Sequence, residues 1–208
     1  MAAVAALPAA SVIVLRDAPL EVLMLRRNAT ASFVPNVWVF PGGAVDERDT
    51  CDSILATMRV AAARELFEET GIWLGTPPAG AATKRRALLA GTVVFDELLA
   101  EAPVDLERLV WTSHWITPLG LPKRFDTYFF VTEVSRDVEA SLAGDEASDL
   151  AWIAPEAALT TLEMIFPTVK NLEAIRGFPS VRALIESRIG ADVHAVQPVI
   201  IDKRIVLP

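Results

Sequence analysis

The sequence predicts an α/β protein in which short strands and helices alternate along one chain. Short β-branched and apolar runs recur between turn signals, which is the pattern of buried strands. Between them lie segments with apolar residues at three- and four-residue spacing, which is typical of amphipathic helices. Because strands interleaved with helices fold into a sheet covered by helices, we expect a mixed sheet sandwiched between helical layers.

The first strands are expected near the N-terminus. Ser11–Leu15 and Glu21–Leu25 are two such runs, and Arg16–Leu20 between them has the composition of a hairpin turn. Val37–Phe40 predicts a third short strand, and Pro41–Gly43 ends it.

A helix is expected from about Asp52 to Thr70. Asp49 or Asp52 can cap its start, and Gly71 suits the left-handed position that ends a helix. The residues of its apolar face are Val60, Ala63 and Phe67.

The second half of the chain predicts more helices and strands. Lys84–Ala102 is expected to be mainly helical, whereas Val196–Val206 is ambiguous and stays open. Strands are expected at Val110–Ile116, Thr127–Val134 and Ala151–Ile153, and helices at Pro155–Thr161, Thr168–Arg176 and Ser180–Arg188. We therefore expect a single domain over residues 1–208, with a core over about 11–160 and a helical C-terminal extension over about 161–208.

Composition excludes several classes of protein. The 208 residues are 52% hydrophobic and 22% charged, which is typical of globular rather than disordered chains. With 19 Lys and Arg against 27 Asp and Glu, the net charge is −8, so binding to nucleic acid or to an anionic membrane is not expected. The single cysteine, Cys51, forms no internal disulfide. Because no apolar run reaches the ~18 residues of a spanning helix, we expect a cytoplasmic protein.

The most informative feature is an acidic cluster near the end of the first predicted helix. Glu65, Glu68 and Glu69 fall within about 100° on one helix face. Like charges at this spacing repel, and the helix dipole disfavours negative charge at a C-terminus. A hard divalent cation such as Mg²⁺ would compensate for both effects. The alternative is an acidic face that only contacts water.

Two motifs at and before this cluster are specific. Arg64–Ile72 resembles the REUxEExGU half of the box that defines the Nudix hydrolase family, with Leu66 and Ile72 at its two apolar positions. Phe40–Gly43 resembles the loop that precedes this helix in Nudix proteins. The resemblance implies a Nudix-type α/β/α sandwich with a mixed sheet and extra C-terminal helices.

The resemblance also implies roles for individual residues. Glu65, Glu68 and Glu69 are expected to bind Mg²⁺ or Mn²⁺, and Arg64 to orient the acidic cluster. One position departs from the Nudix box: counted from Gly43, the box acid falls on Asp49, and fourteen residues instead of seven separate it from the arginine. Seven extra residues make about two helical turns, so the insertion can lengthen the helix or loop without rotating the glutamates.

A second resemblance covers roughly residues 11–155. Val22–Arg27, Phe33–Gly43, His114–Pro118 and Lys123–Phe130 look like the Nudix branch that contains the peroxisomal CoA diphosphatase. It implies hydrolysis of CoA or acyl-CoA at the diphosphate. Another CoA-directed signature of the family places a glycine where this chain has Asn36.

The implied reaction is hydrolysis of a nucleoside diphosphate linked to another group. Bound Mg²⁺ or Mn²⁺ can neutralise the diphosphate and lower the pKa of a water molecule. Glu146 is the candidate general base, although one of the helix glutamates can serve instead, and a solvated loop acid is the alternative interpretation of Glu146.

Several residues are expected to bind the substrate. Arg27 can reach a phosphate, although an arginine at a strand end is often solvated. Arg124 can hold a phosphate through its bidentate fork, or instead pair with an acid that fixes the strand. The loop residues expected at the substrate are Phe40, Gly42 and Gly43. His114 is interpreted as a core residue. Trp38, Trp111, Trp115 and Trp152 are interpreted in the same way, with the alternative that one of them lines the nucleotide pocket.

Three functional hypotheses remain open. The first is a Mg²⁺- or Mn²⁺-dependent diphosphatase acting on CoA or acyl-CoA. The second keeps this chemistry but changes the substrate to ADP-ribose, NADH or a nucleotide sugar. The third is a Nudix domain that binds a nucleotide and regulates without turnover, against which the intact glutamate trio argues. The apolar C-terminal helices leave room for a homodimer.

Overall fold

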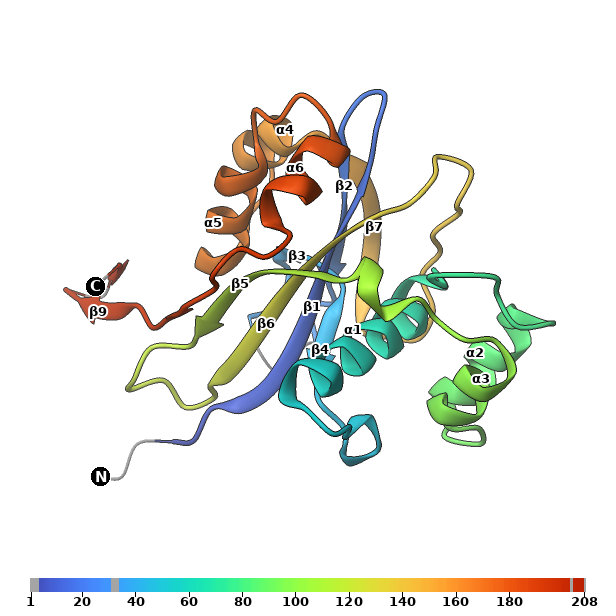
Figure 1. Ribbon diagram of the computed structural model, residues 1–208. Helices are drawn as coiled ribbons and strands as arrows, with labels where there is room; N and C mark the ends of the chain where they lie inside the picture. The colour runs from blue at the N-terminus through green and yellow to red at the C-terminus, as the bar shows by residue number, and fades with distance from the viewer. Residues whose placement is uncertain (1–3, 31–33, 203, 208) are drawn as a thin grey trace.

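The computed structural model describes residues 4–30, 34–202 and 204–207. Phe33 is the first residue of Phe33–Gly43, one of the segments that resemble the CoA diphosphatase branch, and it lies outside the described residues. Most of the described chain forms one mixed sheet with helices on both faces (Figure 1). The α/β sandwich predicted from alternating strands and helices is confirmed.

Within the described residues the main sheet has eight strands. They are β1 (Leu7–Arg16), β2 (Glu21–Arg27), β3 (Trp38–Val39), β4 (Gly42–Ala44), β5 (Val110–Ile116), β6 (Phe125–Glu133), β7 (Ala147–Ile153) and β8 (Ala195–Val196). Neighbours are hydrogen-bonded along the order β3-β2-β1-β6-β5-β8, and β4 pairs with β1 while β7 pairs with β2. The pairs β1–β6 and β5–β8 are parallel and the others are antiparallel, so the sheet is mixed.

The central strand β1 is buried on both faces. It forms the predicted hairpin with β2, in which Leu15 pairs with Val22. Because side chains alternate along a strand, Val12 and Val14 enter the hydrophobic cluster under α1, whereas Ile13 and Leu15 enter the cluster on the opposite face. Each face of the sheet therefore needs its own helical cover.

The helices provide that cover. They are α1 (Ile54–Thr70), α2 (Ala81–Leu89), α3 (Phe95–Glu101), α4 (Pro155–Thr161), α5 (Phe166–Ile175) and α6 (Val181–Arg188). The first three lie on one side of the sheet and the last three on the other (Figure 1). In the part of the chain that the structure describes, no helix has both the length and the apolar character needed to cross a membrane.

Helix α1 carries the acidic motif and is held by packing and by both of its ends. Its start is capped by Ser53, whose hydroxyl accepts from the Ala56 amide, so the expectation that Asp49 or Asp52 is the cap is wrong. Its end is Gly71 at φ 76°, as predicted. Leu66 and Phe67 are fully buried against the sheet, which leaves the glutamates on the remaining face.

The segment Lys84–Ala102 is mainly helical, as expected, but it forms two helices with a break between them. α2 ends at Leu89 and α3 begins at Phe95, with Gly91 between them at φ 67°, in the left-handed region. A helix cannot continue through that backbone conformation, and glycine adopts it without a steric penalty.

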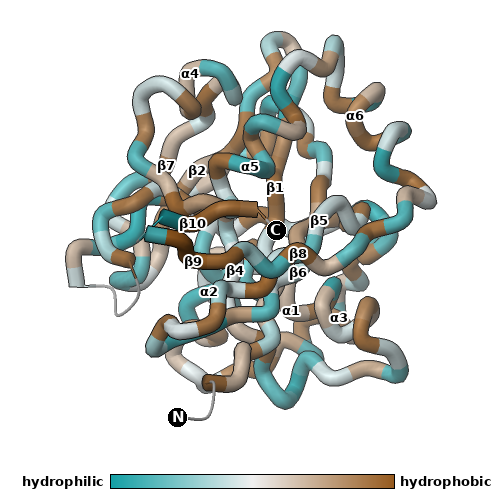
Figure 2. Tube along the Cα trace, turned by 90° about the vertical axis from the view of Figure 1, so that its left-hand side faces the viewer, coloured by the Kyte–Doolittle hydropathy of each residue, from teal (hydrophilic) through white to brown (hydrophobic). Residues whose placement is uncertain are grey.

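The C-terminal residues also differ from expectation. After Arg188 the described chain forms short strands rather than a helical continuation over residues 161–208, and the open segment Val196–Val206 becomes extended. β9 (Val199–Ile201) and β10 (Arg204–Val206) make a separate two-stranded sheet. Figure 2 shows this hairpin as a largely hydrophobic segment at the surface.

Candidate functional site

A cleft of about 570 Å³ lies over the C-terminal half of α1. Its walls come from α1, from β4 with the residues after it, and from the loop that precedes β7. The acidic and basic residues that line it are Asp46, Arg64, Glu65, Glu68, Glu69, Asp145 and Glu146. The structure therefore brings the predicted cluster on α1 together with Glu146, which is distant in sequence.

Arg64 is the centre of the hydrogen-bond network in this cleft. Its Nε and Nη2 donate to the two carboxylate oxygens of Asp49 at 2.9 and 2.8 Å. Its Nη1 donates to Glu65 at 2.9 Å and to Glu68 at 3.2 Å, and Nη2 also reaches the Ala44 carbonyl at 2.9 Å. A planar guanidinium with fixed donor directions thereby orients three carboxylates at once.

The ion pair with Arg64 shows what Asp49 does in the structure. Asp49 ends a short 3₁₀ turn, is buried, and receives the bidentate contact despite the fourteen intervening residues. The residues between them form a loop and the first turns of α1, starting at Ile54. The insertion thus lengthens the approach to Arg64 while keeping an acid against it.

The glycines of the preceding loop allow close contact with the glutamates. The Gly42 amide donates to Glu69 Oε2 at 2.8 Å. A Cβ on Gly43 would lie 2.5 Å from Glu65 Oε1, so no larger residue fits without moving that carboxylate. A Cβ on Gly42 would lie 2.3 Å from the Ala10 carbonyl of β1. Gly42 is therefore required by the packing of β4 against β1, whereas a larger residue at Gly43 would displace the Glu65 carboxylate.

The cleft has an excess of negative charge. Burial raises the pKa of Glu65 to about 7. The charge of Arg64 opposes this rise, and the charges of Glu68 and Glu146 add to it. Burial also raises the pKa of Glu68, and that of Glu69 lies well above its ordinary value because of burial and the charge of Glu65. The carboxylates thus lack sufficient positive charge around them.

The donor set fits a hard divalent cation. Glu65, Glu68 and Glu69 offer only oxygen ligands, and a cation would compensate their charge. Among the described residues, however, no three His, Cys, Asp or Glu side chains are already grouped around one point. Two of the glutamates instead turn toward Arg64 and the third toward the Gly42 amide. Mg²⁺ is commonly held by one or two carboxylates with water and substrate phosphate, so this arrangement remains compatible with it.

A second cavity, of about 320 Å³, adjoins the cleft at Gly43, which lines both. Its walls are largely apolar and include Phe40, Trp115 and Phe166. Phe40 is buried and meets Phe129 edge to face at 6.3 Å between ring centroids. Trp115 was interpreted as a core residue, with a place in the pocket as the alternative, and the cavity favours that alternative. Phe166 was not expected at a site, because nothing in its local sequence distinguishes it from a core residue.

Arg27 lies at the wall of this apolar cavity. Its Nε is buried and makes no hydrogen bond to any of the residues described. Its positive charge acts on Glu69 and lowers the pKa of that carboxyl against the effect of burial. Arg27 is therefore close enough to the acidic cluster to act on Glu69, and it is not a solvated arginine at a strand end, which was the alternative interpretation.

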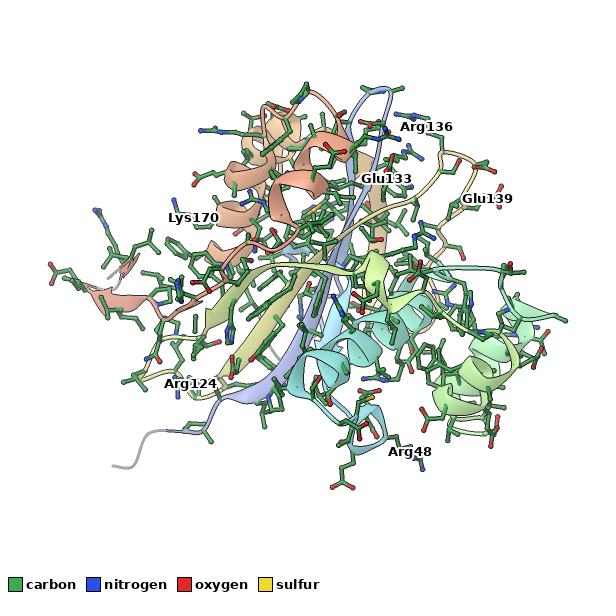
Figure 3. The ribbon with its side chains drawn as sticks, viewed as in Figure 1. Arg48, Arg124, Glu133, Arg136, Glu139 and Lys170 are labelled. Carbon is green, nitrogen blue, oxygen red and sulfur yellow. The ribbon has the colours of Figure 1, made fainter. Side chains whose placement is uncertain are left out.

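Arg124 lies elsewhere, at the start of β6 beside the N-terminal segment (Figure 3). It is buried and donates to the backbone carbonyls of Val4, Thr117 and Pro118 at 2.6 to 3.1 Å. These contacts fix the β5–β6 connection against the N-terminus. The structure thus favours the alternative of a strand-fixing arginine, with carbonyls in place of an acid, over the predicted phosphate contact.

His114 is buried and one of its ring nitrogens has a polar partner, as expected. Its Nε2 contacts Asp126, and its ring lies 4.1 Å from that of Tyr128. Trp111 stacks on Tyr128 at 5.2 Å. This aromatic group forms part of the packing between β5 and β6.

The chain is similar to known proteins over most of its length. The family model of the NUDIX domain matches residues 6–170. A Caenorhabditis elegans protein named "Putative nudix hydrolase 7" is 35% identical over 155 residues, covering 71% of this chain and 51% of that protein. An acyl-coenzyme A diphosphatase of Xenopus laevis is 26% identical over 205 residues, covering 67% of this chain and 54% of that protein. The chain thus spans about half the length of these relatives.

Solved structures share the fold. A NUDIX hydrolase from Alicyclobacillus acidocaldarius matches with a TM-score of 0.79 and 27% identity, over 88% of this chain and 96% of that chain. The NUDIX domain of Shewanella oneidensis NrtR, solved with ADP ribose, matches with a TM-score of 0.54 and 18% identity, over 83% and 88% of the two chains. At that identity the second likeness concerns the fold alone.

Proposed function

The chain belongs to the NUDIX domain family, and on that premise we propose that it is a divalent-metal-dependent diphosphatase. Its substrate is a nucleoside diphosphate joined to another group. The single observation that carries the proposal is the cluster of glutamates on α1, held around Arg64 in a cleft short of positive charge. A protein that only bound a neutral ligand would gain nothing from this charge.

We propose a different role for each group of residues in the cleft. Glu65, Glu68 and Glu69 hold Mg²⁺ or Mn²⁺, and Arg64 orients the first two through Nη1. When bound, the cation supplies charge neutralisation for the diphosphate and makes water a better nucleophile. Glu146, which lines the same cleft, is the proposed general base.

Positioning of the diphosphate is assigned to the boundary between the two cavities. Gly43 lines both, so a substrate that spans them places its diphosphate beside the glutamates. Arg27, which lines the apolar cavity and whose charge acts on Glu69, is the residue that we propose to pair with a phosphate there. Phosphoryl transfer depends mainly on such positioning and on electrostatic stabilisation.

Coenzyme A or acyl-CoA is the substrate class that we propose first. The apolar cavity beside Gly43 is suited to the pantetheine or acyl part of such a molecule. The similarity to an acyl-coenzyme A diphosphatase supports the same choice. The rival substrates are ADP-ribose, NADH and nucleotide sugars, because the same metal chemistry would hydrolyse their diphosphates as well.

A substrate screen tests the proposal. CoA, an acyl-CoA, ADP-ribose, NADH and a nucleotide sugar are each incubated with Mg²⁺ or Mn²⁺, and the products are separated by chromatography. We expect the highest kcat/KM for CoA or acyl-CoA, and no turnover with EDTA. Preference for another diphosphate would change the substrate and keep the chemistry. No turnover of any diphosphate would favour a non-catalytic, nucleotide-binding regulator.

A further inference from the structure

Arg85 on α2 is a buried arginine outside the network of Arg64. Only 6% of its surface is exposed, and each of its three nitrogens donates a hydrogen bond. Nε donates to the Glu68 carbonyl at 2.9 Å, Nη1 to the Ser141 hydroxyl at 3.1 Å, and Nη2 to the Ser141 carbonyl at 2.8 Å. In the described part of the chain no carboxylate forms an ion pair with it. Burying a cation without an ion-pair partner is unfavourable, so its placement calls for an explanation.

These bonds connect two segments that both line the acidic cleft. The Glu68 carbonyl belongs to the last turn of α1, where carbonyls lack helical partners and a cation is favourable. Ser141 lies in the connection between β6 and β7, over residues 134–146, which ends at Glu146. The Ser141 amide also donates to the Thr70 carbonyl at 2.9 Å. Ser141 is therefore tied to the end of α1 directly and through Arg85.

The other end of the loop is tied to the sheet. The Asn28 amide donates to the Glu146 carbonyl at 2.9 Å, and its side-chain amide donates to the Asp145 carbonyl at 3.0 Å. The carboxylate of Glu146 itself makes no hydrogen bond or ion pair with the residues that the structure describes. Its position over the cleft is therefore set by the backbone anchors at Ser141 and Asn28.

We infer that Arg85 is a positioning residue that holds the loop carrying Glu146 at a set distance from the glutamates of α1. Because one guanidinium bonds both the Glu68 backbone and the Ser141 backbone, the two acidic walls of the cleft move together. The effect on catalysis rests on the proposed role of Glu146, whereas the effect on the loop does not.

Hydrogen exchange tests the positional part without any substrate. Arg85→Gln is compared with the full-length wild type and with Arg86→Gln, a matched control whose exposed side chain bonds only Thr83 of its own helix. The amides of Ser141 and Asn28 donate hydrogen bonds at the two ends of the loop, and we expect both to exchange at least about tenfold faster in Arg85→Gln, with Arg86→Gln unchanged. Unchanged exchange over these residues would overturn the inference. Arg85→Lys keeps the positive charge but not the planar guanidinium with its several donors. It replaces Arg85→Gln in this experiment if that variant fails to fold, and we expect the same faster exchange from it.

A double-mutant cycle tests the catalytic part. Glu146→Gln is expected to lower kcat by about 10²-fold, and Arg85→Gln by about tenfold or more in the wild-type background. Added to Glu146→Gln, the Arg85 substitution should cost less than about twofold, because the group that it positions is already lost. Additive losses, or an unaffected kcat in Glu146→Gln, would overturn this part. If the wild type hydrolyses no diphosphate, the proposed function fails, and the exchange experiment still decides the role of Arg85.

Discussion

Replacing Glu65 by glutamine is expected to stabilise the metal-free protein at pH 8. Burial raises the pKa of this carboxyl from its ordinary 4.5 to about 7, so the folded state holds the proton more tightly than the unfolded chain. Ionisation of Glu65 therefore opposes folding, and its cost grows as the pH rises from about 4.5 through about 7. Glutamine has nearly the shape of the neutral acid and does not ionise.

The magnitude follows from the difference between the two pKa values. A difference of about 2.5 units corresponds to about 3 kcal/mol of unfolding free energy when Glu65 is ionised in both states, as at pH 8. At pH 5 the folded carboxyl is protonated, and the expected gain falls to about 1 kcal/mol or less. For a chain of this size the gain at pH 8 raises the Tm by about 6–12 °C.

Thermal unfolding followed by circular dichroism in EDTA measures this gain at both pH values. Glu139→Gln, at an exposed glutamate in the β6–β7 connection (Figure 3), is the matched control and should leave the Tm unchanged. Added Mg²⁺ should stabilise the wild type more than Glu65→Gln. A variant less stable than the wild type at pH 8 in EDTA, or equally stabilised at pH 5 and pH 8, would refute the reasoning.

Three further predictions concern neighbouring residues. Asp49→Asn breaks the buried pair with Arg64 and should lower the unfolding free energy in urea by about 3 kcal/mol; a loss under about 0.5 kcal/mol would contradict that pairing. Gly43→Ala should weaken Mn²⁺ binding at least about tenfold by displacing Glu65, and unchanged binding in calorimetry would show that the carboxylate position is unimportant. Trp115→Ala should raise KM about tenfold or more for acyl-CoA and much less for ADP-ribose, and equal changes would argue against an acyl subsite.

Local patterns predicted most of the fold. β5 and α4 have the bounds expected from their own residues, Val110–Ile116 and Pro155–Thr161, because apolar alternation and an N-terminal proline are local signals. The break at Gly91 was missed, since the leucines on both sides continue a helical pattern while the backbone conformation of one glycine ends the helix. The β9–β10 strands were left open because periodicity alone does not distinguish such short segments.

The candidate site, like the fold, was predicted where the signal is local and missed where it depends on distant residues. The glutamates of α1 lie on one helix face, so their spacing and the resemblance together predicted the cluster. The pairing of Asp49 with Arg64 was not predicted, because the inserted residues hide it from any count along the sequence. Phe166 and Arg85 gave no local signal, since each reaches its site only through the packing of distant elements. For Arg124 a phosphate contact and a strand-fixing role both stayed open, because an arginine that binds carbonyls has no separate sequence signature.

The central claim is that the glutamates of α1 hold the cation used in diphosphate hydrolysis. Its most direct test is kcat for Glu68→Gln and Glu69→Gln with CoA and saturating Mg²⁺, with circular dichroism to show that the fold is retained. The account predicts a loss of at least about 10²-fold in each variant. Full activity in both variants would contradict it.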